Sequence, residues 1–174
     1  MKIEIISGGE YGVEQASLAA AWSRECPLKG FVRKGFITSR GPCEKLKFLG
    51  VKEIESDRLR DCAQRCIDEC NGVLLLRSGE LGVIEENIKG LIGESKPYFE
   101  YDFLNPVDLR TITLWLLTEG ITKLYVTGKS DPNGLDIFYK KTLALMNHVI
   151  KDVNDELTRN ELNEKKKAPV KKVG

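Results

Sequence analysis

The chain has 174 residues, of which 41% are hydrophobic and 30% are charged. This length and composition fit one folded domain with its own core, and they exclude a chain that is disordered throughout. No apolar run reaches the roughly 18 residues that a membrane-spanning helix requires. The N-terminal residues MKIEIISGG lack the long apolar stretch of a secretory signal. We therefore expect a soluble, cytoplasmic protein.

The formal net charge of +1 is unevenly distributed, because the segment Lys165–Gly174 holds five lysines and no acidic residue. The rest of the chain is mildly acidic, which argues against a nucleic-acid partner, since such a protein needs a basic face. We expect residues 156–174 to form a polar helix end and a flexible basic tail. An electrostatic tether to RNA or to a membrane surface is the alternative interpretation of the tail.

Five cysteines and a single histidine, His148, limit the metal chemistry available to the chain. Cys62, Cys66 and Cys70 recur every four residues in a predicted helix, where a rise of ~1.5 Å per residue places the outer two ~12 Å apart. One zinc ion with Zn–S bonds of ~2.3 Å cannot bind both. We expect these cysteines to form a buried stripe facing a sheet, and we expect no directly coordinated metal. His148 is interpreted as a surface or packing residue.

Strand and helix patterns alternate from the N-terminus. A strand is predicted over Lys2–Ile6, and apolar residues at helical spacing predict a helix over Val13–Arg24. A short strand is expected within Gly30–Gly35, and the weakly periodic segment Phe36–Gly50 is expected to be a loop. Ser56-Asp57 can cap a helix that runs to about Cys70.

The alternation continues with Gly72–Leu76, an apolar run typical of a strand buried on both faces. A helix is predicted over Val83–Ile92, and a strand over Tyr98–Phe103. Asn105-Pro106 is a favourable helix start, because proline at the first helical position loses no needed hydrogen bond. This helix is expected to end near Gly120.

The last predicted strand is Leu124–Thr127, and the loop Gly128–Gly134 joins it to a long helix from about Leu135 past Val153. Strands that alternate with helices imply crossover connections and a mostly parallel sheet. We therefore predict a Rossmann-like α/β fold with three αβα layers, about five or more strands and a single domain over residues 1–155.

Ligands of such sheets bind beyond the carboxyl ends of the strands, and three of the predicted strands end in glycine-bearing loops. Glycine allows close approach of the backbone, and a following helix N-terminus favours an anion. A single loop of this kind can equally be a plain connection, and the spacing matches neither GxGxxG nor the P-loop. The residues expected to contact a phosphate-bearing ligand are Ser7, Gly8, Gly9, Gly12, Lys34, Arg77, Ser78, Gly79, Gly82, Gly128, Lys129 and Ser130.

Further charged residues lie near these loops. Arg33 and Arg40 could complete an anion pocket, although each is also a plausible solvated surface charge. The nearby carboxylates are Glu10, Glu14, Glu85 and Glu86. A general base among them would need burial to raise its pKa, whereas Glu14 can also simply favour the dipole of its helix.

The segment ISGGEYGVEQASLAAA, which begins at Ile6, is similar to the pattern ISGGQTGVDRAALDAA of the molybdenum carrier proteins. These form a circularly permuted branch of the lysine-decarboxylase-like, nucleotide-binding Rossmann (SLOG) superfamily. The later segment VTGKSDPNGLDI also resembles the family pattern, and the resemblance extends from about Ile3 to Ile150. It implies a small-molecule ligand: the molybdenum cofactor (molybdopterin) or a nucleotide.

The chain departs from the family pattern at several positions. Glu10 replaces a glutamine, Tyr11 a threonine and Glu14 an aspartate. Lys129 stands where Pro-Arg is usual, and lysine lacks the planar bidentate grip of arginine. Arg65 lies where the family carries an arginine before its central strand.

Three functions follow from these observations. The first is a binding or carrier protein for a phosphate-bearing, nucleotide-like molecule. The second is an enzyme that cleaves a nucleotide N-glycosidic bond, because Gly79, Gly82 and Glu85 or Glu86 partly match the PGGxGTxxE motif of phosphoribohydrolases. Its catalytic candidates are Glu85, Glu86 and Arg65. The third is a sensor or assembly module without a ligand, in which the long C-terminal helix serves a partner. We also expect a homo-oligomer.

Overall fold

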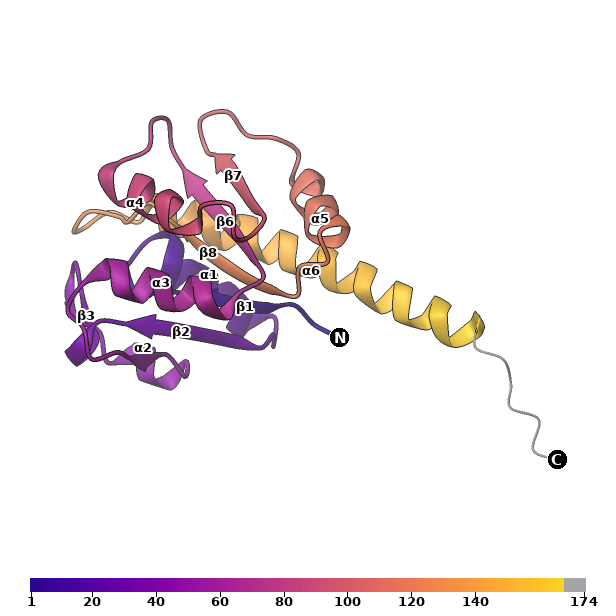
Figure 1. Cartoon of the computed structure of the whole chain (residues 1–174), viewed down its shortest axis with the longest axis horizontal. Coiled ribbons are helices and arrows are strands. Elements are labelled where there is room, and N and C mark those ends of the chain that lie inside the picture. Colours follow the sequence, from indigo (N-terminus) through magenta and orange to yellow (C-terminus); the bar gives the residue numbers. More distant parts are fainter. Residues whose placement is uncertain (168–174) are drawn as a thin grey trace.

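A parallel sheet of six strands runs through the molecule in the order β5-β2-β1-β8-β6-β7 (Figure 1). The structure is a computed structural model, and it describes residues 1–167. The predicted Rossmann-like α/β fold is confirmed. The strands of the sheet are β1 (Glu4–Ser7), β2 (Leu28–Val32), β5 (Lys52–Glu53), β6 (Gly72–Arg77), β7 (Tyr98–Asp102) and β8 (Lys123–Gly128).

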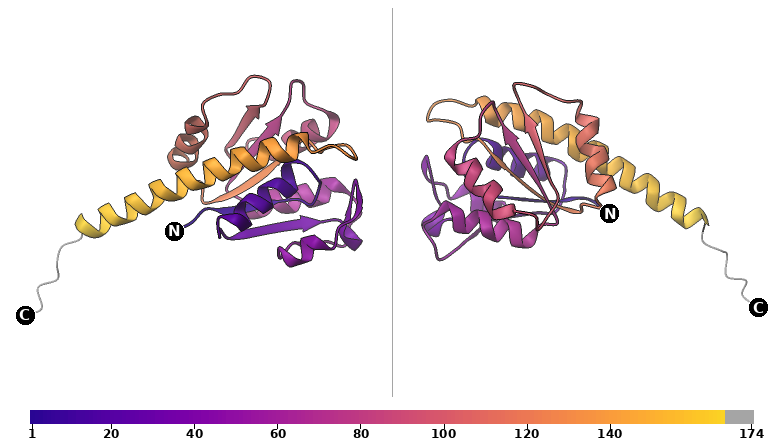
Figure 2. Two further views of the ribbon diagram at one scale, coloured as in Figure 1. Left: turned by 180° about the vertical axis from the view of Figure 1, so that it is seen from behind. Right: turned by 45° about the horizontal axis from the view of Figure 1, so that its top comes forward.

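Helices cover both faces of the sheet, which gives the three layers. One face carries α1 (Val13–Ser23), α5 (Leu109–Thr118) and α6 (Ile137–Lys167), which share a core cluster with apolar residues of the strands. The other face carries α3 (Leu59–Glu69) and α4 (Val83–Ile92), which form a second cluster. Figure 2 shows α1 and α6 together on one side of the sheet. Strand β6 has five buried residues in a row, because helices exclude water from both of its faces.

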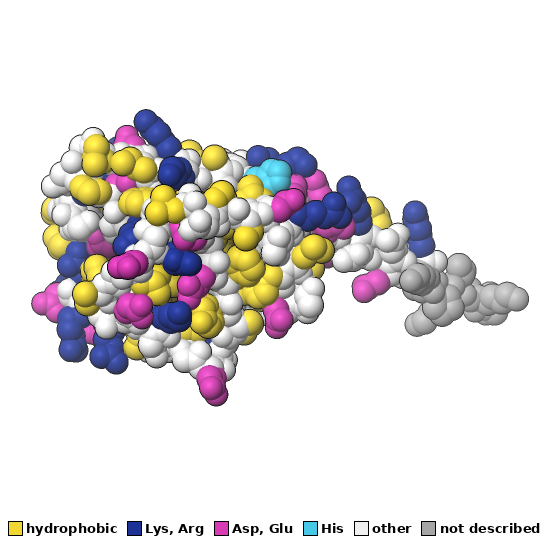
Figure 3. Space-filling view, turned by 90° about the horizontal axis from the view of Figure 1, so that it is seen from above, with side chains coloured by type: hydrophobic (Ala, Val, Ile, Leu, Met, Phe, Trp, Pro, Cys, Tyr) yellow, Lys and Arg dark blue, Asp and Glu magenta, His cyan; other side chains and the backbone are white. Residues whose placement is uncertain are grey.

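The C-terminal part of α6 projects beyond the sheet in every view of the ribbon (Figures 1 and 2). Positive and negative side chains are interspersed along it and over the neighbouring surface (Figure 3). The expected basic tail falls largely on residues 168–174, which lie outside the described residues. Within residues 1–167, no helix is long and apolar enough to cross a membrane.

The predicted loop over residues 36–50 is wrong in part. This region holds a short hairpin of β3 (Ile37–Thr38) and β4 (Gly41–Pro42), and then helix α2 (Lys45–Phe48). Leu46 of α2 is buried in a small cluster beside β2. Elements of two to four residues are shorter than the repeats that periodicity detects, so the sequence carried no signal for them.

Several predicted boundaries also shift. Strand β2 ends at Val32, and a 3-10 turn (η1, Lys34–Phe36) replaces the rest of the expected strand. Helix α5 begins at Leu109 because the Asp108 carboxylate accepts the N–H of Arg110 at 2.9 Å, so Asn105-Pro106 does not open it.

The cysteine stripe is buried as predicted. Cys62, Cys66 and Cys70 lie on α3 or at its end and face the sheet. Burial raises the pKa of the Cys62 thiol to about 12, so it stays protonated near neutral pH. In the described part of the chain no three His, Cys, Asp or Glu residues are grouped to hold a metal ion. His148 is exposed and lies 3.1 Å from Asp152.

Candidate functional site

The three glycine loops lie at one edge of the sheet. Strands β1, β8 and β6 are adjacent and parallel, with Ile6 opposite Tyr125 and Leu76 opposite Gly128. Their carboxyl ends therefore meet, and the loops that follow them converge. This is the edge at which α/β sheets bind ligands.

The first and third loops are bound directly to each other. The N–H of Val13 donates to the carbonyl of Lys129 at 3.1 Å, and the N–H of Asp131 donates to the carbonyl of Tyr11 at 2.9 Å. Gly12 lies between them with φ of +124°, and a Cβ there would stand 2.7 Å from the Lys129 carbonyl oxygen. Glycine at this position is required by the close approach of two backbones.

Carboxylates of the chain occupy amides in the first two loops and in the helix that follows the third. The Glu14 carboxylate accepts the N–H of Glu10 at 3.0 Å, and the Asp102 carboxylate accepts the N–H of Gly79 at 3.0 Å. The buried Asp131 accepts the N–H groups of Phe138 and Tyr139, in the first turn of α6, at 2.8 and 2.7 Å. These amides are already bonded within the chain, so they are not free to bind a ligand anion.

A cavity of about 90 Å³ lies beyond the ends of β1 and β8, on the face of the sheet that carries α3 and α4. Apolar side chains from both helices form its walls, and polar groups from the loops close its inner end. Exposed residues of α3 and α4 surround its mouth. The lining residues are Gly8, Gly9, Glu10, Glu14, Phe31, Val32, Arg33, Leu59, Arg60, Cys62, Ala63, Ile84, Asn87, Ile88, Leu91, Thr127, Gly128 and Ser130.

The structure brings four of the predicted ligand contacts to this cavity: Gly8, Gly9, Gly128 and Ser130. Ser7 is fully buried, and its hydroxyl donates to the Val126 carbonyl at 2.6 Å. The predicted contacts that do not line the cavity are Ser7, Gly12, Lys34, Arg77, Ser78, Gly79, Gly82 and Lys129.

Glu14 is the carboxylate at the inner end of the cavity. It lies in the first turn of α1 and accepts hydrogen bonds from the Glu10 N–H and from the Thr127 hydroxyl, each at 3.0 Å. Its carboxylate lies over Gly8, where an added Cβ would stand 2.2 Å from the nearer oxygen. Burial raises the pKa of Glu14 to about 7, and hydrogen bonds from the Glu10 N–H, the Thr127 hydroxyl and the Tyr125 phenol only partly oppose this effect. Glu14 therefore titrates near neutral pH at the cavity wall.

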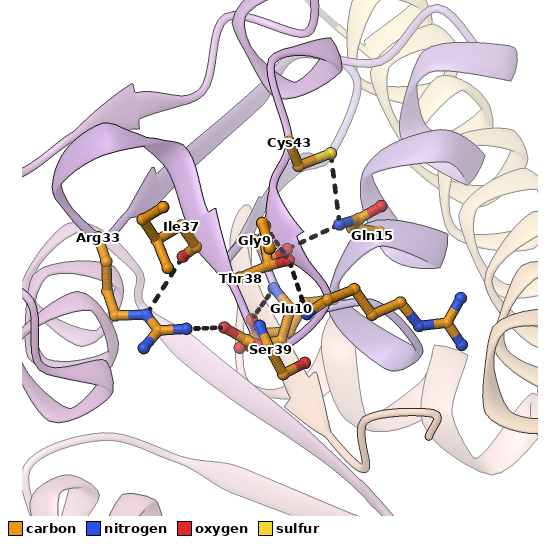
Figure 4. A network of polar contacts seen from close by, with 11 residues as sticks. Gly9, Glu10, Gln15, Arg33, Ile37, Thr38, Ser39 and Cys43 are labelled. Carbon is orange, nitrogen blue, oxygen red and sulfur yellow. Dashed lines mark hydrogen bonds and ion pairs between the residues drawn. The ribbon is translucent and has the colours of Figure 1, made fainter. Parts of the chain in front are cut away.

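Glu10, by contrast, is held by its own partners (Figure 4). Its carboxylate accepts from the Arg33 guanidinium at 3.1 Å and from the Ser39 N–H at 2.8 Å. Gln15 donates to the Gly9 carbonyl at 2.8 Å. These contacts fix the first loop against the β3–β4 hairpin. They therefore also hold in place the part of the cavity wall that Gly9 and Glu10 form.

Most of the predicted cations are paired within the chain. Lys129 lies 3.4 Å from the buried Glu85, and Lys34 lies 2.9 Å from Glu55. The Arg40 guanidinium stacks over the Tyr11 ring, 3.6 Å from its centroid.

Arg77 is also paired, since it lies 3.3 Å from each of Glu100 and Asp102. Arg60, at the cavity mouth, has no carboxylate within 4.0 Å among residues 1–167. Arg60 is therefore the cation best placed to meet an anionic group of a ligand.

The candidate catalytic residues lie away from the cavity wall. Glu85 is buried against Lys129, and Glu86 is exposed on α4. Arg65 lies on the exposed side of α3, over the Phe31 ring and 4.0 Å from Glu69. This placement does not favour the N-glycosidase hypothesis that rested on these three residues.

Sequence reasoning missed the walls of the cavity. Leu59, Arg60 and Ala63 come from α3, and Asn87 and Leu91 come from α4. No glycine motif precedes α3, and the loop Gly79–Gly82 before α4 pointed to the strand end and not to the side chains of the helix. The available signal was their amphipathic pattern, since a helix that packs on a sheet beside a strand end also borders the ligand edge.

Comparison with known proteins agrees with this architecture. The chain resembles a crystal structure titled "Putative molybdenum carrier protein" from Syntrophus aciditrophicus SB, with a TM-score of 0.71 and 20% identity over 87% of this chain and 94% of that one. At this identity the likeness shows the fold. A comparison with curated proteins gives no significant match. The model of the circularly permutated YpsA SLOG family matches residues 5–150. The chain therefore belongs to the circularly permutated YpsA SLOG family.

Proposed function

We propose that this chain is a small-molecule binding protein whose cavity beyond β1 and β8 takes a phosphate-bearing, nucleotide-like ligand. One observation carries the proposal: one cavity at the ligand edge combines apolar walls, the carboxyl of Glu14 and the cation Arg60, which has no carboxylate partner among residues 1–167. Ligand sites typically combine apolar walls with a few placed polar groups in this way.

The size of the cavity limits what it encloses. Pockets that hold a whole drug-sized molecule measure roughly 300 to 1,000 Å³, whereas this one measures about 90 Å³. A flat ring that enters between α3 and α4 would meet Ala63 and Ile88 on its faces. The remaining part of the ligand would stay at the mouth.

The mouth favours a negative charge. Arg60 lies in the first turn of α3, and Ile84 lies in the first turn of α4. The cap residue of α4, Gly82, provides no side-chain hydrogen bond to the first amides of that helix. A phosphate near these amides and the Arg60 guanidinium would be stabilised by both.

The molybdenum cofactor is one ligand of this kind, because it joins a flat heterocycle to a phosphate. The name of the structural neighbour suggests such a cargo for that protein. The described residues offer no group of three metal-ligating side chains. In this proposal the protein binds the organic part of the cofactor, and molybdenum arrives as part of the cargo.

Calorimetric titration of the full chain tests the proposal, with GMP, AMP, UMP, inorganic phosphate and molybdenum cofactor released from a denatured molybdoenzyme as probes. Arg60→Gln should weaken binding of the phosphate-bearing probes about tenfold, which corresponds to ~1.4 kcal/mol. Arg58→Gln is the matched control, because Arg58 is exposed two residues earlier and does not line the cavity.

Two results would count against this function. Failure of every probe to bind at millimolar concentration would remove it. Equal losses in the Arg60 and Arg58 variants would move the anion site away from the cavity. The expected homo-oligomer, cytoplasmic location and lack of a nucleic-acid partner stay predictions, and light scattering of the full chain tests the first of them.

A further inference from the structure

The proposed ligand site contains one group that distinguishes between heterocycles. Glu14 lies at the inner end of the cavity, where the enclosed part of a ligand would end. Each of its two oxygens accepts one hydrogen bond from the chain, Oε2 from the Glu10 N–H and Oε1 from the Thr127 hydroxyl. A carboxylate has about four acceptor positions. The Tyr125 phenol is a third donor close to this carboxyl, and it can donate to the Thr127 hydroxyl instead. In that arrangement one further acceptor position on each oxygen is available to a ligand.

We propose that Glu14 selects ligands whose ring presents two adjacent N–H donors, as guanine does with its ring N–H and its exocyclic amino group. This inference rests on the proposed function and specifies the class of heterocycle that the site takes. The two oxygens of a carboxylate can accept a parallel pair of N–H bonds, as they do from a guanidinium group. A heterocycle that turns an acceptor toward Glu14, as adenine does with its N1, would leave one carboxylate oxygen without a donor.

The surroundings of Glu14 make this selection sensitive to pH. The titratable and charged groups around it are Glu10, Arg33, Cys62, Cys66 and Tyr125. Burial raises the pKa values of the two thiols and of the phenol, so these groups stay neutral near pH 7. Glu10 and Arg33 form an ion pair with each other. A change in base preference between pH 6 and pH 8 therefore reports the loss of the Glu14 proton.

The sign of the effect follows from the donor pair. With a pKa of about 7, Glu14 is mostly protonated at pH 6 and mostly ionised at pH 8. Only the ionised form accepts both N–H groups, so preference for guanine increases with pH by about tenfold over this range. The ratio of GMP to AMP affinity is the proper readout, because both nucleotides carry the same titrating phosphate.

The test is calorimetric titration of the full chain with GMP, IMP and AMP at pH 6 and pH 8. The order GMP, IMP, AMP is expected, because IMP retains the ring N–H and lacks the amino group. Glu14→Gln should reduce GMP affinity by roughly 10- to 100-fold and remove the pH dependence of the GMP to AMP ratio. Glu86→Gln is the matched control, since Glu86 is an exposed carboxylate outside the cavity.

The wild-type pH series requires no variant, so it remains decisive if Glu14→Gln fails to fold. Nucleotide binding without preference for guanine, or a preference that survives in Glu14→Gln, would overturn this inference and leave the proposed function standing. Failure of all nucleotides and phosphate-bearing probes to bind would overturn both. A pH-independent GMP to AMP ratio in the wild type would also overturn the assignment to Glu14.

Discussion

The hydroxyl of Thr127 donates to the carboxylate of Glu14 at 3.0 Å, and this bond connects the end of β8 to the first turn of α1. The pair places an ionisable group between two strand ends that also border the cavity. The same carboxyl therefore influences both the stability of the fold and the chemistry of the site.

The first prediction concerns the dependence of stability on pH. Burial raises the pKa of Glu14 from 4.5 to about 7, so the folded chain holds this proton more tightly than the unfolded chain. The associated stability is complete below about pH 4.5 and is lost as the pH rises through 7. At ~1.4 kcal/mol per pKa unit, the loss is on the order of 3 kcal/mol. Urea unfolding of ligand-free protein between pH 5 and pH 8.5 measures it.

Glu14→Gln should flatten this profile, because the variant has no proton to lose at position 14. Asp102 acts in the opposite direction, since hydrogen bonds from the Gly79 and Leu104 amides lower its pKa to about 2. Its contribution is lost only in strong acid, outside the measured range. Stability that is constant or increases between pH 5 and pH 8.5 in the wild type would contradict the first prediction.

The second prediction concerns the ion pair between Arg33 and Glu10, which holds the first loop in place. Arg33→Gln leaves the Glu10 carboxylate without its guanidinium partner, and Glu10 is 7% exposed. We expect a loss of roughly 2 to 3 kcal/mol in the free energy of unfolding, at the lower end for a buried pair because Arg33 retains some exposure. A double-mutant cycle with Glu10→Gln measures the coupling. Additive losses in the double variant would show that the two side chains do not interact.

The third prediction compares two glycines, Gly128 in a crowded environment and Gly90 in an open one. A Cβ at Gly128 would stand 1.9 Å from the Leu76 carbonyl oxygen of the neighbouring strand. Gly128→Ala should therefore destabilise the chain by more than ~3 kcal/mol, because neither backbone can move without a large cost in free energy. Gly90→Ala should instead stabilise it by about 0.5 to 1 kcal/mol, because Gly90 lies within α4 with open space around it. Thermal unfolding of both variants measures the difference, and similar effects would contradict the described packing.

Much of the fold was predictable because its elements are long and strongly patterned. The run GVLLL predicted β6, and the cysteine stripe predicted the buried face of α3. The hairpin β3–β4 was not predictable, since two-residue strands show no alternation.

Only the position of the candidate site, at the edge of the sheet, was predictable from the sequence. Glycine loops indicated where the strands end, and Gly8 and Gly128 do border the cavity. The sequence could not reveal that Glu14 folds back onto the Glu10 amide, because such a contact depends on the turn between them. It also could not reveal that the apolar walls come from α3 and α4, which approach each other only in the folded chain.

The fourth prediction concerns the start of α6. Asp131 is 2% exposed and accepts the N–H groups of Phe138 and Tyr139. Asp131→Ala should cost about 1 to 2 kcal/mol, as for the loss of other helix caps, whereas Asp131→Asn should retain part of this stability through its carbonyl oxygen. Urea unfolding of both variants measures the costs. Equal stability of the wild type and the alanine variant would show that these bonds are not needed.

The central claim is that a ligand enters the cavity between α3 and α4. Two adjacent residues allow a matched test, because Ile84 lines the cavity and Val83 does not, although both are exposed. Calorimetric titration with GMP of the Ile84→Glu and Val83→Glu variants adds the same charge inside and outside the mouth. We expect binding to fall at least tenfold in Ile84→Glu and to change much less in Val83→Glu. Equal binding by the two variants, or failure of every phosphate-bearing probe to bind the wild type, would contradict the account.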